Sequence, residues 1–101
     1  MFHSAPVQAN IANVLDDQGK PEEALALFHE ALVIFEKDLC QDHPLMADTL
    51  YNIGNAYESQ ELFELAAENF ENCAAIYSKV HGDNHSETID ARTRAKSARK
   101  D

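Results

Sequence analysis

The sequence predicts an all-α protein made of two helix–turn–helix units followed by a C-terminal helix. Three observations support this prediction. The chain repeats itself, with position i matching position i+42, apolar side chains recur at helical spacing, and no segment alternates polar and apolar residues as a half-buried strand would. A length of 101 residues allows one domain. We place repeat 1 at about 2–43, repeat 2 at about 44–85, and the final helix at about 86–100.

The repeat is visible as identical residues 42 positions apart, aligned without a gap. The identical pairs include Asn10/Asn52, Ile11/Ile53, Asn13/Asn55, Gln18/Gln60, Glu22/Glu64, Ala24/Ala66, Phe28/Phe70, Ile34/Ile76, Lys37/Lys79 and His43/His85. A period of this length corresponds to one supersecondary unit, which buries its apolar face against its neighbour.

Repeat 1 is expected to begin with a helix from about Ala5 to Gln18, ended by the turn Gly19-Lys20-Pro21. A second helix follows from Glu22 to about Leu39. Its apolar stripe is wide, so one side must face its own first helix and the other side the next unit. The residues expected to face inward are Val7, Ile11, Val14 and Leu15 in the first helix, and Ala24, Leu25, Leu27, Phe28, Ala31, Leu32 and Phe35 in the second.

Repeat 2 is expected to begin near Pro44, because proline suits the first helical position, with His43 or Asp42 as the preceding cap. The first helix ends near Ser59-Gln60 and the second runs from about Glu64 to Val80. Gly82 is then expected to take the left-handed capping conformation. The residues expected to face inward are Met46, Leu50, Ile53 and Tyr57, then Leu65, Ala66, Phe70, Cys73, Ala74 and Tyr77.

The last segment, residues 86–101, departs from the pattern after Asp90. Arg92, Thr93 and Arg94 stand there at the positions that Leu50, Tyr51 and Asn52 hold in repeat 2. Ile89 and small alanines are its apolar residues. The segment is therefore either a capping helix or the start of a third repeat, and the sequence leaves both open.

Charge is distributed unevenly along the chain. Residues 1–85 hold three of the eight basic residues and fifteen of the eighteen acidic ones, whereas residues 86–101 are net basic. An acidic body argues against nucleic acid as a partner, since phosphates require the opposite charge. The basic end is interpreted as a solvated helix, with contact to an anionic surface as the alternative. No apolar run spans a membrane and no secretory leader is visible. Cys40 and Cys73 form no CxxC pair, so we expect a reduced, cytoplasmic setting.

The residues resemble the tetratricopeptide repeat (TPR) family. The stretch Asn52-Ile53-Gly54-Asn55-Ala56-Tyr57 is similar to the motif of the family's first helix, and Ala66, Phe70 and Cys73 stand at the small, aromatic and small positions of the second. The run from Leu39 to Asn52 is similar to the 42-residue repeats of kinesin light chain and nephrocystin-3-like proteins. The resemblance implies a right-handed α-solenoid. The departures from its pattern are Gln8, Pro21, Cys40 and Glu61.

In such a stack the first helix of each unit lines a concave groove. Its candidate residues for binding a peptide here are Asn10, Asn13, Asp17, Asp48, Asn52, Asn55 and Ser59. By resemblance, Asn10 and Asn52 match an asparagine that contacts bound peptide in kinesin light chain-like grooves. Asn13 and Asn55 match asparagines of the carboxylate-clamp repeats that bind chaperone C-termini. The alternative for Asn10 and Asn52 is a hydrogen bond to the neighbouring helix or to backbone.

A complete carboxylate clamp also needs lysine or arginine nearby. Ala9, Tyr51 and Thr93 occupy the positions where some of these would stand. A chaperone tail is therefore not the expected ligand. Side-chain amides still suit a peptide backbone, because they both donate and accept hydrogen bonds.

The sequence therefore predicts a protein-interaction scaffold, a fragment of a longer repeat protein that binds a segment carrying basic groups. The alternative is self-association as a homodimer. The given residues include no repeat that would cover the outer side of the first unit, so Val14, Leu27 and Val33 are expected to stay partly exposed. A regulatory domain attached to an enzyme is not distinguishable from the first interpretation.

No catalytic, cofactor or metal site is expected. The chain has no glycine-rich phosphate loop and no nucleophile motif. His81 and His85 are spaced as metal ligands on one helix, but Gly82 should break that helix. His85 is the repeat partner of His43, so a connector role is the favoured interpretation.

Overall fold

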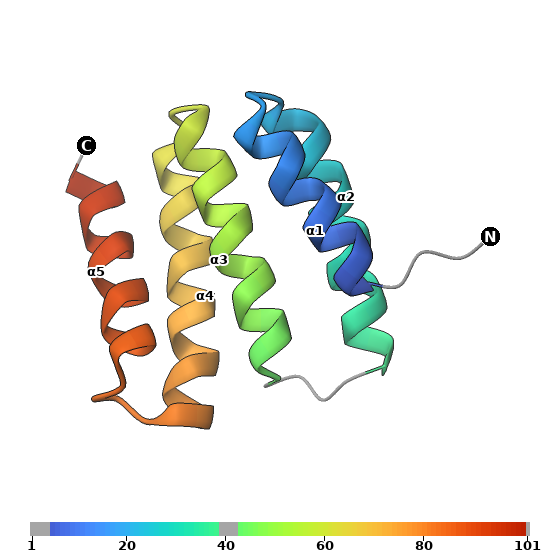
Figure 1. Ribbon diagram of the computed structural model, residues 1–101. Coiled ribbons are helices and arrows are strands. Elements are labelled where there is room, and N and C mark those ends of the chain that lie inside the picture. The colour runs from blue at the N-terminus through green and yellow to red at the C-terminus, as the bar shows by residue number, and fades with distance from the viewer. Residues whose placement is uncertain (1–4, 39–42, 101) are drawn as a thin grey trace.

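The computed structural model describes residues 5–38 and 43–100, which form five helices and no strand. They are α1 (Ala5–Asp17), α2 (Pro21–Asp38), α3 (Pro44–Ser59), α4 (Phe63–His81) and α5 (Ser86–Lys100). α1 and α2 form one antiparallel pair, and α3 and α4 form the next (Figure 1). The two pairs meet where α2 packs on α3, and α5 packs on α4. The predicted all-α repeat fold is confirmed.

Histidine caps the start of α3 and of α5. The extended backbone of His43 places its Nδ1 to accept a hydrogen bond from the Leu45 N–H at 3.1 Å. His85, its counterpart in the next repeat position, accepts one from the Glu87 N–H at 3.2 Å. Each bond satisfies an amide that lacks a partner inside its helix. This confirms the connector role of His85 and His43 as the cap, while Asp42 lies outside the described residues.

The α4–α5 connection does not adopt the predicted left-handed capping conformation. Gly82 has φ 97° and ψ 161°, a region open to glycine but distinct from the left-handed helix. The hydroxyl of Thr88 donates to the Gly82 carbonyl at 2.9 Å. This bond links the connection to the first turn of α5.

The turn inside each unit uses the same backbone conformation with different residues. Gly19 has φ 79°, and Glu61, its counterpart in repeat 2, has φ 62°. A side chain in this region costs about 1–2 kcal/mol because Cβ approaches the following carbonyl oxygen. Repeat 2 therefore carries strain that repeat 1 avoids.

Exchanging these turn residues should change stability in opposite directions. Glu61→Gly should raise the free energy of unfolding by about 0.5–1 kcal/mol. Gly19→Ala should lower it by about 1 kcal/mol, even though a Cβ there meets nothing within 4 Å. Urea denaturation measures both. A less stable Glu61→Gly variant would contradict the assigned turn conformation.

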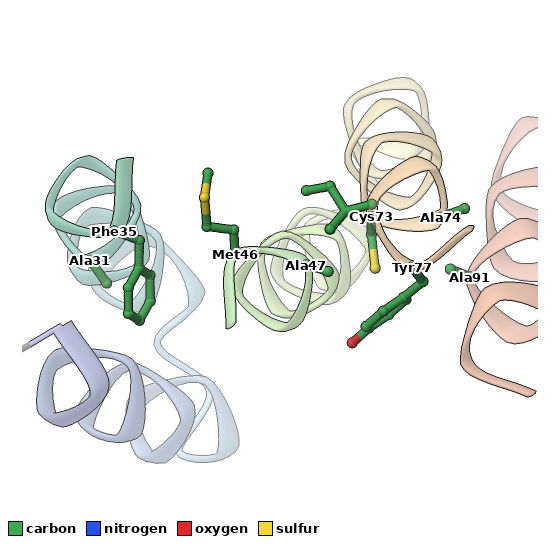
Figure 2. Packing of buried hydrophobic residues seen from close by; sticks show 9 residues of the cluster. Ala31, Phe35, Met46, Ala47, Cys73, Ala74, Tyr77 and Ala91 are labelled. Atoms are coloured by element: carbon green, nitrogen blue, oxygen red, sulfur yellow. The ribbon is translucent and has the colours of Figure 1, made fainter. Parts of the chain in front are cut away.

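Three clusters of buried residues form the core. The first joins all units and contains Ala31, Phe35, Met46, Ala47, Cys73, Ala74, Ile76, Tyr77 and Ala91 (Figure 2). The second contains Ala12, Ala24, Leu25, Phe28, Ile53 and Ala56. The third contains Ala66, Ala67, Phe70, Ala95 and Ala98. The many alanines let the helices approach closely, and aromatic rings fill the space beside them.

Two residues predicted to face inward are instead exposed: Ile11 at 41% and Leu65 at 42%. Val14, predicted to lie on the inward face but to stay partly exposed, is 53% exposed. Ile53 and Ala56, the counterparts of Ile11 and Val14, are fully buried in the second cluster beside the first unit. No described helix covers the corresponding side of α1. Leu65 has Glu23 as its counterpart, so this position lies on the solvent side in both units.

Val14 and Val33, both expected to stay partly exposed, are exposed in the structure. Val33 is 51% exposed and Leu27 is half-buried. Val7, also predicted to face inward, belongs to the part of α1 whose side chains are not described.

The basic residues of α5 pair with the acidic body, so the helix is more than a solvated end. Arg99 bonds Glu64 at 2.6 Å and Glu71 at 2.8 Å, and Arg92 bonds Asp83 at 2.8 Å. These pairs are largely exposed to water and salt, so each stabilises the fold only weakly. The sequence interpretation missed them because most of the partners lie far apart in the chain. Together with Ala91, Ala95 and Ala98, they hold α5 against α4.

Candidate functional site

A hollow of about 390 Å³ lies on the side of α1 and α3, and we call it the asparagine hollow. Its lining residues are Asn10, Asn13, Phe35, Leu45, Asp48, Thr49, Tyr51, Asn52 and Tyr77. Figure 2 shows why two of the aromatic rings reach it: Phe35 on α2 and Tyr77 on α4 both point toward the layer that contains α1 and α3. Phe35 and Tyr77 are counterparts in the repeat register.

A second hollow of about 210 Å³ adjoins the first, and we call it the tyrosine hollow. It is lined by Tyr51, Tyr77, Glu87 and Asp90. The two hollows share Tyr51 and Tyr77 in their linings, and together their lining residues come from α1 to α5. We refer to the two together as the groove.

The groove contains only part of the predicted site. Asn10, Asn13, Asp48 and Asn52 line it together, whereas Asp17, Asn55 and Ser59 do not. Asp17 is exposed at the last position of α1. The Asn55 side chain accepts a hydrogen bond from Arg94, and the Ser59 hydroxyl donates to the Asn55 carbonyl at 3.1 Å.

The amides of Asn10 and Asn52 are open to a ligand. Within the described ranges, neither side chain has a hydrogen-bond partner, and both line the asparagine hollow. Asn10 is exposed and Asn52 is half-buried. The alternative considered for them, a hydrogen bond to the neighbouring helix or to backbone, does not occur among these residues.

Two tyrosine hydroxyls orient the carboxylates of the groove. The Tyr77 hydroxyl donates to Asp48, and the Tyr51 hydroxyl donates to Asp90 at 2.7 Å. Burial, followed by the bond to Asp90, raises the pKa of Tyr51 to about 12. Burial and the bond to Asp48 also raise the pKa of Tyr77. Both phenols therefore remain neutral donors at physiological pH.

The charge of the groove is acidic. Asp48, Glu87 and Asp90 supply carboxylates, and no described lysine or arginine lines either hollow. Asp48 and Asp90 are counterparts in the repeat register, so the acidic character follows the repeat. Charge at this surface therefore favours a cation over an anion.

Arg94 fills a cation site beside the groove. Its Nη2 donates to Asn55 Oδ1 at 2.6 Å and to Glu58 Oε1 at 2.8 Å. Its guanidinium lies over the rings of Phe70 and Tyr51, 5.1 and 5.4 Å from their centroids. The chain thus shows how this surface holds an arginine, through an amide, a carboxylate and an aromatic face.

The first unit has no such arginine. Asn52 stands at the position equivalent to Arg94, and Asp16 at the position equivalent to Glu58. One carboxylate oxygen of Asp16 is buried without a hydrogen-bond partner among the described residues. Its pKa is raised, first by burial and then by repulsion from Asp17. The sequence interpretation missed both Arg94 and Asp16, although the register relates Arg94 to Asn52.

His81, His85 and Cys73 do not line either hollow. In the parts of the chain that the structure describes, no three side chains from His, Cys, Asp and Glu gather as a metal site would require. His81 and His85 stack with their ring centroids 4.4 Å apart. Burial raises the pKa of the Cys73 thiol to about 12, which leaves it unreactive at neutral pH. Cys40 lies outside the described residues. Within the same ranges, no helix combines the length and apolarity that crossing a membrane requires.

The family model of the tetratricopeptide repeat matches residues 4–71. The chain belongs to the tetratricopeptide repeat family. TPR repeats generally mediate protein–protein interactions, and the family is of a non-catalytic scaffold type. No curated protein matches this sequence.

Solved structures with the same fold carry TPR-like repeats. One contains the nearly identical TPR-like repeats assigned to a kinesin light chain of Podosopora anserina, with a TM-score of 0.79, 24% sequence identity and coverage of 99% of this chain. A point variant of that protein matches equally well. This chain spans 50% of each of those chains. The resemblance to kinesin light chain repeats is therefore confirmed for the fold.

Proposed function

We propose that this TPR chain binds a segment of a partner protein in the groove, with the backbone of the segment bonded by Asn10 and Asn52. The observation that carries the proposal is that both amides line one hollow and have no hydrogen-bond partner among the described residues. An unpaired amide exposed in a hollow can donate to and accept from a peptide bond without first breaking an internal bond. Asn13 is placed to extend this contact along α1.

The ligand segment carries basic groups in this proposal. Asp48, Glu87 and Asp90 line the groove, and the described residues place no positive charge there. Such attraction weakens when salt rises, because exposed charges are screened over about 10 Å at about 0.1 M salt.

The proposal has three further parts. The chain divides into repeats at about 2–43 and 44–85, and it belongs to a longer parent protein. Its setting is the reducing cytoplasm, which suits the free thiol of Cys73.

A random peptide library tests the function. Peptides selected on the wild-type chain should bind the variant Asn10→Ala/Asn52→Ala at least about tenfold more weakly, the effect of about two lost hydrogen bonds. Asn72→Ala is the matched control, because Asn72 is exposed on α4 and lines neither hollow. Affinity should fall as salt is raised from well below to well above the physiological range. Equal loss in the control, or binding strengthened by salt, would contradict the groove.

Self-association is a second candidate, favoured by the uncovered side of the first unit. Ile11 and Val14 are exposed there, whereas their counterparts Ile53 and Ala56 are fully buried. Burying such apolar surface against a second copy is favourable by about 25 cal/mol per Å², before the cost of association. A two-fold homodimer is the commonest closed arrangement.

Sedimentation of the chain at high micromolar concentration tests this second candidate. A dimer mass is expected, returning to the monomer in the variant Ile11→Ser/Val14→Ser. Both positions are already exposed, so the variant keeps its fold. A monomer mass for the wild-type chain would reject self-association and leave the peptide groove unaffected.

A further inference from the structure

We infer that the tyrosine hollow accepts an arginine side chain of the bound segment, with its guanidinium between the rings of Tyr51 and Tyr77 and against the carboxylates of Glu87 and Asp90. The inference rests on the proposed function and names one side chain of its ligand. It starts from a cavity, about 210 Å³ in volume, whose described lining consists only of two aromatic rings and two acidic residues.

The composition of the hollow matches what a guanidinium requires. A planar guanidinium stacks on aromatic faces and donates in a fork to carboxylate oxygens, which an ammonium group does less well. Tyr77 is 4% exposed, so its ring forms a fixed wall. Glu87 and Asp90 line the hollow from α5 and are exposed, so their charge is accessible to a cation arriving from solvent.

Hydrogen bonds already hold the lining in place. Tyr51 donates to Asp90 at 2.7 Å, which fixes the carboxylate while leaving its other oxygen to accept from a ligand. Tyr77 is held in the same way by Asp48. The Glu87 carboxylate takes part in no ion pair among the described residues, and neither does that of Asp90. Binding would therefore break no internal salt bridge.

The chain contains its own example of such recognition. Arg94 lies next to the tyrosine hollow, since its guanidinium lies over Tyr51, which also lines the hollow, and over Phe70. Its Nη2 donates to Glu58. The tyrosine hollow offers the same partners, aromatic ring and carboxylate, but no arginine of the described chain lines it. Tyr51 contributes to both sites, so a bound arginine would lie beside Arg94, with Glu58 and Asp90 separately neutralising the two charges.

The probe is Nα-acetyl-arginine amide, compared with Nα-acetyl-citrulline amide, which has nearly the same shape without the charge. Each is titrated into the 101-residue chain while the ring signals of its three tyrosines are followed by NMR. The arginine probe should give saturable shifts at Tyr51 and Tyr77, with Tyr57 as the internal reference outside the hollow. The citrulline probe should bind at least tenfold more weakly.

The variant Glu87→Gln/Asp90→Asn should reduce arginine affinity at least tenfold. The variant Glu36→Gln/Glu68→Gln, which removes the same charge from exposed positions outside both hollows, should leave it unchanged. Equal binding of citrulline, equal loss in the charge control, or shifts confined to other residues would overturn the inference.

The outcome is separable from that of the proposed function. If library peptides depend on Asn10 and Asn52 but are indifferent to Glu87→Gln/Asp90→Asn, the arginine site fails and the groove stands. If the arginine probe binds the tyrosine hollow while the variant Asn10→Ala/Asn52→Ala loses no affinity for library peptides, the proposed function fails and the arginine site stands.

Discussion

Replacing Gly54 with alanine should destabilise the chain by about 1–2 kcal/mol, even though alanine is the better helix former. A Cβ at this position would lie 2.8 Å from Cε1 and 2.9 Å from Cζ of Phe70. Alanine gains about 1 kcal/mol in helix propensity, whereas forcing atoms into a packed core costs about 1–3 kcal/mol. The Phe70 ring has little freedom to move, because it is fully buried with Tyr51 packed edge-on at 5.4 Å. Denaturant unfolding measures the net effect.

A double variant tests the cause. Phe70→Leu removes the ring that the new Cβ meets, so Gly54→Ala/Phe70→Leu should be more stable than the sum of the two single effects predicts. The sequence of the first unit agrees with this reasoning: alanine (Ala12) stands at the counterpart of Gly54 where the counterpart of Tyr51 is the small Ala9. Additive losses would show that the close contact between α3 and the Phe70 ring is not the source.

Replacing Ala66 with leucine should cost about 1–3 kcal/mol. Ala66 is fully buried among Ala67, Phe70, Ala95 and Ala98, a cluster that joins α4 to α5, with the partly buried Tyr57 packed against it. A leucine side chain has no space there, so α5 or the Phe70 ring must shift. A lower midpoint of thermal or denaturant unfolding is the expected result.

The neighbouring residue supplies the control for Ala66. Leu65 is 42% exposed on the same turn of α4, so Leu65→Ala should change the unfolding free energy by less than about 0.5–1 kcal/mol. A larger loss at Leu65 than at Ala66 would mean that the assigned face of α4 is wrong.

Strong local signals explain why the helices could be predicted closely. Pro44 marks the first residue of α3, and Gly19 marks the turn after α1, as expected. The repeat then transfers each assignment from one unit to the other. The repeat could also have shown that Leu65 faces solvent, because its counterpart in the first unit, Glu23, is charged. The prediction that Ile11 is buried was wrong for another reason. Its counterpart Ile53 is buried against the preceding unit, and the described residues include no unit that would cover Ile11 in the same way.

The groove could be predicted only in part. Asn10, Asn13, Asp48 and Asn52 meet because they occupy one face of the first helices of the two units. Asn55 lies on the same face, but its side chain accepts a hydrogen bond from Arg94 on α5. The repeat pattern has decayed in α5, so the sequence did not predict this bond. No sequence motif indicated the tyrosine hollow. The helical spacing predicts Tyr77 as a core residue, and only the three-dimensional packing shows that its hydroxyl donates to Asp48.

Mapping backbone amide shifts on binding tests the central claim, that the groove holds a partner segment, most directly. A library-selected peptide is titrated into the isotope-labelled chain, and the residues that shift are assigned. We expect the largest changes at Asn10, Asn13, Asp48 and Asn52, with the outer surface of α2 and α4 unaffected. Changes centred on exposed residues of α2 and α4, with these four unmoved, would contradict the account.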